Sequence, residues 1–266
     1  MSIWFVPRDA AARSMGADDV ASALEARGET VIRNGSRGML WMEPLVERAD
    51  ERHGPRVGWS NVTAGQIDAG LPDEQADNFI GAVEEFDYLA RQNRWIYERV
   101  GITDPVDPED YVAHGGLTGL KNALAMSGSD VVQAVTDSGL RGRGGAGFPA
   151  GIKWRTVADQ APAPHAGESQ NAPAHKYICV NADEGDSGTF ADRMLMEGDP
   201  FCLLEGMTIA AHAVGADRGL VYLRSEYPDA IATLQSAIWI AREQGWLGDN
   251  ILGSDLCFDV EIRVGA

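Results

Sequence analysis

The chain has 266 residues, with 40 aspartates and glutamates against 22 lysines and arginines, which gives a formal net charge of −18 at pH 7. Hydrophobic residues make up 44% and charged residues 23%, which is typical of a folded protein and excludes a disordered chain. The acidic balance argues against nucleic acid or an anionic membrane surface as the main partner, because both repel a negatively charged protein.

Residues 1–72 have the pattern of a small α/β unit. A short apolar strand is expected at residues 3–6, a helix at 18–27, and a second strand at 30–33 that ends at a turn. Further strand candidates are residues 39–42 and 45–46. A strand–helix–strand unit followed by more strands predicts a small α/β layer.

Residues 73–112 change in character. Apolar side chains recur every three or four positions, as at Phe79, Val83, Phe86 and Leu89. This spacing predicts a long amphipathic helix of about five to six turns. Glycine and proline end the pattern, and we expect a helical linker here between two domains.

Residues 113–266 have the pattern of a second α/β domain. Helices are expected at 117–126, 131–135, 203–214 and 230–242, and strands at 177–180, 220–223 and 258–264. This alternation predicts a parallel sheet. Residues 162–174, rich in proline and alanine, are expected to form an exposed, mobile insertion. The chain ends directly after a strand, so we expect a C-terminally truncated domain.

The cysteines and histidines offer no sequence motif for a metal. The three cysteines are too far apart for a zinc or iron–sulfur motif, and an odd number does not suit a disulfide framework. We expect buried, reduced thiols and a cytoplasmic protein. The histidines show no ligand spacing and are expected to be structural or exposed: His53, His114, His165, His175 and His212. No apolar run is long enough to predict membrane insertion.

A glycine-rich loop, residues 139–151, accounts for much of the high glycine content. Gly142, Gly144, Gly145 and their glycine neighbours let backbone N–H groups approach an anion. No acidic residue lies between Asp137 and Asp159, whereas this stretch contains basic residues, namely Arg141, Arg143, Lys153 and Arg155. The loop is therefore a candidate phosphate or nucleotide cradle, and the alternative is a flexible surface loop. It formally matches GxGxxG but follows a predicted helix, which excludes an ordinary dinucleotide fingerprint.

An acidic segment follows the strand expected at residues 177–180. It contains Asn181, Asp183, Glu184 and Asp186. Open α/β sheets bind ligands beyond the carboxyl ends of their strands, and carboxylates there can accept hydrogen bonds from ribose or ribityl hydroxyls. A calcium or magnesium loop is the competing interpretation, although the EF-hand pattern is not met; a solvated turn is the other.

Residues 138–154 and 180–200 together resemble the flavin- and NADH-binding diaphorase subunits of respiratory NADH:quinone oxidoreductases, NAD-reducing hydrogenases and NAD-dependent formate dehydrogenases. The run Tyr222-Leu-Arg-Ser-Glu-Tyr-Pro228 fits the same family. The resemblance covers roughly residues 110–266. It implies a Rossmann-like α/β domain that binds FMN and NAD, in which hydride passes between the two and no catalytic acid or base is required.

The resemblance also implies roles for particular residues. Gly142, Arg143 and Gly144, with Gly145 in the same loop, would line FMN, and Lys153 would lie near its phosphate or ribityl chain. Asn181, Asp183 and Glu184 would hold the flavin from the opposite side. Phe148 would stack on the nicotinamide dinucleotide. Asp186 stands where respiratory members carry glutamate beside the nicotinamide.

The N-terminal unit resembles a thioredoxin-like 2Fe-2S module that has lost its cluster cysteines. With the motif around Gly185-Asp186-Ser187, it most resembles the β subunit of molybdenum-dependent, NAD-linked formate dehydrogenases. The implied partners are a molybdenum- and iron–sulfur-containing catalytic subunit and a small thioredoxin-like 2Fe-2S subunit. A 4Fe-4S cluster is expected only in the missing C-terminal part. The alternatives are a quinone- or hydrogenase-linked flavin subunit and a non-catalytic docking fragment.

Overall fold

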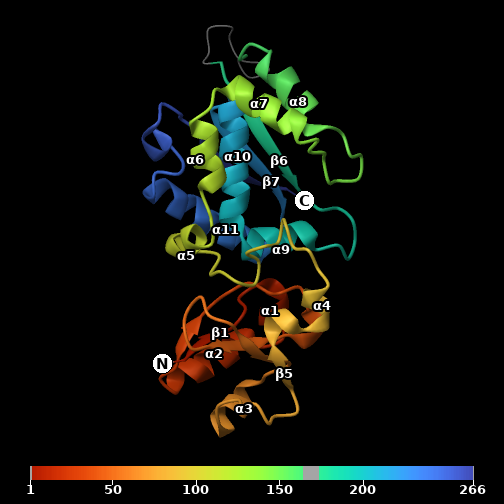
Figure 1. Cartoon of the computed structure of the whole chain (residues 1–266), viewed down its shortest axis with the longest axis vertical. Helices are drawn as coiled ribbons and strands as arrows, with labels where there is room; N and C mark the ends of the chain where they lie inside the picture. Colours follow the sequence, from red (N-terminus) through yellow and green to blue (C-terminus); the bar gives the residue numbers. More distant parts are fainter. Residues whose placement is uncertain (1, 164–173, 266) are drawn as a thin grey trace. The chain divides into compact units, whose positions relative to one another are not determined.

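The computed structural model describes residues 2–163 and 174–265 (Figure 1). Most of the insertion expected at residues 162–174, and His165 within it, lies outside these residues. The chain divides into two compact units. Unit 1 comprises Met1–His114, Ser187–Pro200 and Pro228–Leu234, and unit 2 comprises Gly115–Asp186, Phe201–Tyr227 and Gln235–Ala266. The α/β class is confirmed, whereas the boundaries expected at residues 72 and 112 stay a prediction.

Unit 1 contains a mixed sheet with the strand order β2-β1-β3-β4-β5. Strands β1 and β2 are parallel and the other neighbours are antiparallel. Helix α2 connects β1 to β2, and α3 follows β4, which is the βαβ then ββα order of a thioredoxin-like module. The elements are β1 (Ile3–Phe5), α1 (Ala10–Ser14), α2 (Ala17–Ala26), β2 (Thr30–Ile32), β3 (Val46–Ala49), β4 (Val57–Trp59), α3 (Ala64–Ala69) and β5 (Phe79–Ala82).

The core of this sheet follows from the helical and strand periods of the sequence. Trp4 on β1 and Trp59 on β4 are both buried in the core, and their ring centroids lie 5.6 Å apart. Val20 and Leu24 are spaced four residues apart on α2 and both are buried against them. The short strands are therefore held by side-chain burial as well as by backbone pairing.

Two expectations for this part of the chain are wrong. Residues 73–112 do not form one long helix, because they contain β5, a 3₁₀ turn (Val83–Glu85), α4 (Asp87–Ala90) and α5 (Pro108–Ala113). Gly81 has a φ of +79°, which no helix accepts, and Phe79 pairs with Trp59 on β4. The helical spacing was a coincidence of apolar residues from separate short elements. Residues 39–42 likewise form a 3₁₀ turn, Leu40–Met42, instead of a strand.

A buried ion cluster lies beside this sheet. Glu47 on β3 is fully buried and accepts hydrogen bonds from Arg37 Nε at 2.8 Å, Arg37 Nη2 at 2.9 Å and Arg56 Nη1 at 3.2 Å. Burial alone would raise the pKa of Glu47, but the charges and hydrogen bonds of Arg37 and then Arg56 bring it below its ordinary value. Removing Glu47 would leave Arg37 and Arg56 without the buried carboxylate that they share.

Unit 2 is built on a parallel sheet with the strand order β6-β7-β8. Gly219 on β7 faces α10, because an added Cβ would lie 2.9 Å from the Met207 methyl group. Glu205 on α10 accepts from the N–H groups of Leu117 and Leu120 at 2.8 and 2.9 Å, which fixes the start of α6. The elements are α6 (Thr118–Leu124), α7 (Gly128–Asp137), α8 (Ala150–Ala158), β6 (Tyr177–Ala182), α10 (Pro200–Val214), β7 (Arg218–Arg224), α11 (Pro228–Glu243) and β8 (Asp259–Gly265). Helix α9 (Ala191–Gly198) lies in unit 1, as do the residues of α11 up to Leu234.

The buried carboxyl group of Glu43 makes the stability of unit 1 depend on pH. Its oxygens lie 2.6 Å from Ser36 Oγ and 2.9 Å from the Leu45 N–H. Burial, followed by the charge of Asp9, raises the pKa of Glu43 to about 8 from an ordinary value of 4.5. The folded state therefore keeps a proton that the unfolded state releases, so the stabilisation is complete below pH 4.5 and is lost as the pH rises toward 8.

We predict that Glu43→Gln removes this loss, because the amide keeps the shape of the protonated acid. Between pH 5 and 8 the wild type should lose up to roughly 4 kcal/mol from this group, and the variant should not. Urea unfolding followed by tryptophan fluorescence at each pH measures the difference, with exposed Glu85→Gln as the control. A decline of equal size in wild type and Glu43→Gln would contradict the prediction.

Candidate functional site

The glycine-rich loop closes like a hairpin between α7 and α8. The Ala150 N–H donates to the Leu140 carbonyl at 2.8 Å, and the Gly142 N–H donates to the Phe148 carbonyl at 2.9 Å. Arg141 Nη1 donates to the Gly147 carbonyl at 2.9 Å. Residues 143–147 therefore form the tip of the loop, and Arg141 shapes the tip from within.

The tip requires glycine and leaves space beside it. Gly145 and Gly147 have φ values of +101° and +61°, a region that L side chains rarely adopt. A Cβ added at Gly144, Gly145 or Gly147 would meet nothing within 4 Å. The loop therefore offers bare backbone to open space, as a backbone anion cradle does.

Helix α8 begins at Ala150, where the loop ends, so its first turn adjoins the loop. Gly151 allows α8 to approach α7, because a Cβ there would lie 2.6 Å from the Thr136 Cα. The first turn of α8 has no acidic residue, and Lys153 follows at the next position. A cation near a helix N-terminus is unfavourable unless an anion lies there, and helix N-termini bind anions readily. Lys153 Nζ lies 5.6 Å from the ring centroid of Phe148, which is 46% exposed.

The acidic segment leaves the carboxyl end of β6 in a tight turn. Asn181 Oδ1 accepts from the Asp183 N–H at 3.2 Å, and Glu184 has a left-handed φ of +46°. The side chains of Asp183 and Glu184 are half-buried, whereas Asn181 and Asp186 are exposed. The segment therefore has a defined backbone and presents its polar groups at the end of the sheet.

Arg224 also belongs to this site, and its role in positioning the acidic turn was not predicted from the sequence. It ends β7, next to the Ala182–Leu223 register pair, and its Nη1 donates to the Glu184 carbonyl at 2.9 Å. Its Nη2 also bonds Glu226 at 3.1 Å, and this hydrogen bond is the main reason that the pKa of Glu226 falls to about 2. The available signal was an arginine at the end of a predicted strand parallel to β6.

The expected site residues thus form two groups. Phe148 contacts both Gly142 and Lys153 within the loop–α8 segment, and Arg143, Gly144 and Gly145 lie on its tip. Asn181, Asp183 and Glu184 form the second group with Arg224, and Asp186 follows them. In Figure 1 the glycine loop extends from α7 and α8 in the direction in which β6 points. That both groups hold one ligand stays a prediction.

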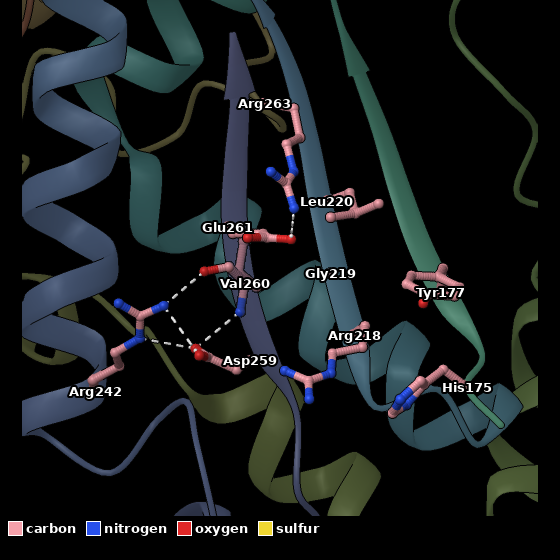
Figure 2. A pocket seen from close by; sticks show the side chains of 10 residues that line it. All are labelled: His175, Tyr177, Arg218, Gly219, Leu220, Arg242, Asp259, Val260, Glu261 and Arg263. Atoms are coloured by element: carbon pink, nitrogen blue, oxygen red, sulfur yellow. Dashed lines mark hydrogen bonds and ion pairs between the residues drawn. The ribbon is translucent and has the colours of Figure 1, made fainter. Parts of the chain in front are cut away.

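A pocket of about 390 Å³ lies elsewhere, at the amino ends of the strands in unit 2 (Figure 2). Arg242 makes two hydrogen bonds to the Asp259 carboxylate, and Arg263 bonds Glu261. The charges of Arg242 and Arg263 are thus already paired within the pocket. The lining residues are His175, Tyr177, Arg218, Gly219, Leu220, Arg242, Asp259, Val260, Glu261 and Arg263.

The expectation of buried thiols is wrong. Cys179 and Cys257 are exposed and Cys202 is partly buried. Cys179 lies in register with Leu220 and Glu261, on the face of the sheet opposite the buried Val221. None of these three cysteines, all within the described residues, forms a disulfide.

Comparison with known proteins identifies the region that carries both loops. Residues 135–266 match the family Complex1_51K, described as the Nuo51 FMN-binding domain. These residues belong to that family. The resemblance to diaphorase flavin subunits is thereby confirmed for this region, and so is FMN as its cofactor.

Individual relatives agree with this assignment. Over 176 residues the chain is 47% identical to the NADP-reducing hydrogenase subunit HndC of Solidesulfovibrio fructosivorans, covering 66% of this chain and 34% of that protein. Over 157 residues it is 46% identical to a subunit of the NADH-quinone oxidoreductase of Rhizobium meliloti, covering 59% and 35% respectively. The chain thus spans about a third of the length of these relatives.

A solved structure of an NAD+-reducing [NiFe]-hydrogenase in the H2-reduced state is also similar. Its TM-score is 0.46 and its identity 25%, and the match covers 100% of this chain and 43% of that one.

Within the described residues, no helix combines the length and apolar character needed to cross a membrane.

We predict that Arg224→Gln loosens the acidic turn, because it removes the hydrogen bond to the Glu184 carbonyl. Hydrogen exchange in the segment 183–186 should become about tenfold faster, which corresponds to the loss of about 1.4 kcal/mol. Mass spectrometry of the exchanged peptides measures this rate. Arg218→Gln, on the same strand but at its other end, is the matched control and should leave the rate unchanged. Equal rates in the two variants would contradict the assigned role.

Proposed function

We propose that this chain is the FMN- and NAD(H)-binding subunit of a multi-subunit oxidoreductase, in which hydride passes between NAD(H) and FMN and electrons then pass to iron–sulfur centres. The observation that carries the proposal is the family match over residues 135–266, which spans both loops. The names of the relatives, one an NADH-quinone oxidoreductase and the other an NADP-reducing hydrogenase, support the nicotinamide partner.

The described residues fit FMN. The phosphate would lie against the bare backbone of Gly144 and Gly145, next to Gly142 at the base of the tip, at the positive end of α8 and within reach of Arg143 and Lys153. Asn181, Asp183 and Glu184 supply oxygen acceptors for ribityl hydroxyls and for a heterocyclic N–H. When bound, FMN supplies the conversion between two-electron hydride transfer and one-electron transfer.

The chain's own residues would then bind and orient FMN and the nicotinamide dinucleotide. The exposed ring of Phe148 is available to stack on the nicotinamide dinucleotide, and Lys153, 5.6 Å from the centre of that ring, would place positive charge beside the FMN phosphate. Asp186 is exposed at the end of the acidic turn, where its charge would act on the nicotinamide side. Arg224 holds the Glu184 backbone and thereby sets the direction of the acidic side chains. Hydride transfer requires these residues to set geometry and local charge, and it requires no proton transfer from them.

The finer assignment that we propose is an NAD-linked formate dehydrogenase. It is supported by Gly185-Asp186-Ser187 in the acidic motif and by a thioredoxin-like N-terminal unit without cluster cysteines. Its partners would be a molybdenum- and iron–sulfur-containing subunit and a small 2Fe-2S subunit. The 47% identity to HndC favours a hydrogenase-linked subunit as the second candidate. The native complex distinguishes them: molybdenum content with formate-dependent NAD+ reduction supports the first, and nickel or H2-dependent reduction overturns it.

We predict that Lys153→Gln weakens FMN binding by about 10- to 100-fold, the loss expected for one charge-assisted hydrogen bond. Riboflavin, which lacks the phosphate, should bind the variant and the wild type equally. Quenching of flavin fluorescence measures both affinities on the purified chain, and exposed Lys121→Gln is the matched control. In the native complex, NADH should bleach the flavin absorbance.

The outcomes separate the proposals. If FMN and riboflavin both bind Lys153→Gln as tightly as wild type, the position given to the phosphate is wrong. If the native complex retains flavin that NADH does not bleach, the diaphorase function is wrong. A chain that retains no flavin even within its complex would favour the non-catalytic docking fragment.

A further inference from the structure

Two histidines and an aspartate meet in unit 1, far from the glycine loop in sequence. His53 lies in the turn between β3 and β4, and Asp110 and His114 are one helical turn apart at α5. Asp110 Oδ1 lies 3.3 Å from His114 Nδ1 and 3.8 Å from His53 Nδ1. The two imidazole rings lie edge to face with centroids 4.9 Å apart. One ligand atom from each residue fits within a mutual distance of 4.8 Å.

The carboxylate of Asp110 points its unsatisfied oxygen at the histidines. Its side chain is 3% exposed. Oδ2 accepts from the Asp104 N–H at 2.9 Å and lies 3.4 Å from Arg52 Nη2. Oδ1 is buried and has no hydrogen-bond partner among the described residues. A buried acceptor left unpaired is costly, so this oxygen is poised to accept a cation.

We propose that His53, Asp110 and His114 form a binding site for a divalent transition-metal ion of the zinc class. Two ligands at zinc bond lengths and a tetrahedral angle are about 3.3 Å apart, the separation of Asp110 Oδ1 from His114 Nδ1. The His53 side chain is 49% exposed, so it can move toward the other two ligand atoms and gives the ion access from solvent. Imidazole nitrogen with one carboxylate oxygen is a donor set that zinc, nickel and copper share.

The hydrogen bonds around the site are compatible with binding by neutral imidazoles. His114 Nδ1 lies 2.9 Å from the Asp110 carbonyl, to which it donates when that nitrogen carries the proton. Binding through Nδ1 exchanges this bond for the metal and moves the proton to Nε2. Arg52 neutralises the second carboxylate oxygen, and a fourth ligand position remains for water. The ion would join the turn after β3 to α5, two segments that are distant in sequence.

The test uses the purified 266-residue chain and Zn²⁺ alone, titrated against a competing chromophoric chelator. We expect a single tight equivalent of Zn²⁺. His53→Ala should weaken binding by at least about 10- to 100-fold, a range that the loss of even an outer-shell group can reach. Because His53 is half-exposed, this variant should fold. His212→Ala, which removes a histidine on α10, is the matched control and should bind as wild type does.

A second readout identifies the ligands. Co²⁺ in place of Zn²⁺ should give the visible absorption bands of a four-coordinate nitrogen and oxygen site, and these bands should be lost in His53→Ala and in Asp110→Asn. Zn²⁺ should also raise the thermal unfolding midpoint of the wild type and leave that of His53→Ala unchanged. Equal Zn²⁺ affinity in wild type and His53→Ala, or no binding by the wild type, would overturn the proposal. Both outcomes are independent of flavin binding.

Discussion

Parallel pairing of β6, β7 and β8 is the constraint on which the candidate flavin site depends. Residues in register on parallel strands end at one edge, so Ala182 beside Leu223 brings the acidic turn next to Arg224. Open α/β sheets bind ligands at this edge. The fixed backbone of Glu184, held by Arg224, follows from the register. A slip of one residue would move Arg224 to the other face of the sheet and release the turn.

Local charge is a second constraint, and it acts against the average of the chain. A net charge of −18 repels polyanions, yet the loop and first turn of α8 contain basic groups and no acid. Because interactions are screened beyond about 10 Å at ordinary salt, a phosphate at this loop would respond to Arg143 and Lys153 more than to distant carboxylates. The composition thus argues against nucleic acid as the main partner without arguing against a nucleotide.

The sequence predicted what short-range periodicity encodes. The three strands of unit 2, its helices α6, α7, α10 and α11, and the βαβ start of unit 1 were found because their apolar residues repeat at strand or helix spacing. Helix α8, directly after the glycine-rich loop, was not expected. The long helix at 73–112 was wrong, since Phe79, Val83 and Leu89 belong to different short elements whose pairing is tertiary. Arg224 and the Glu47–Arg37–Arg56 cluster could not be found, because their roles depend on contacts between distant strands and loops.

The histidine–aspartate cluster shows the same limit more sharply. Asp110 and His114 share a helical turn, but His53 lies on a turn that the strands β3 and β4 bring back beside α5. Sequence spacing alone therefore predicted no metal site at any histidine. What distinguishes this cluster from an ordinary ion pair is the buried Oδ1 of Asp110, which has no hydrogen bond among the described residues while its other oxygen has an N–H donor and a nearby arginine. Folding thus orients one acceptor toward two imidazoles, and a cation is the ligand that such an arrangement satisfies best.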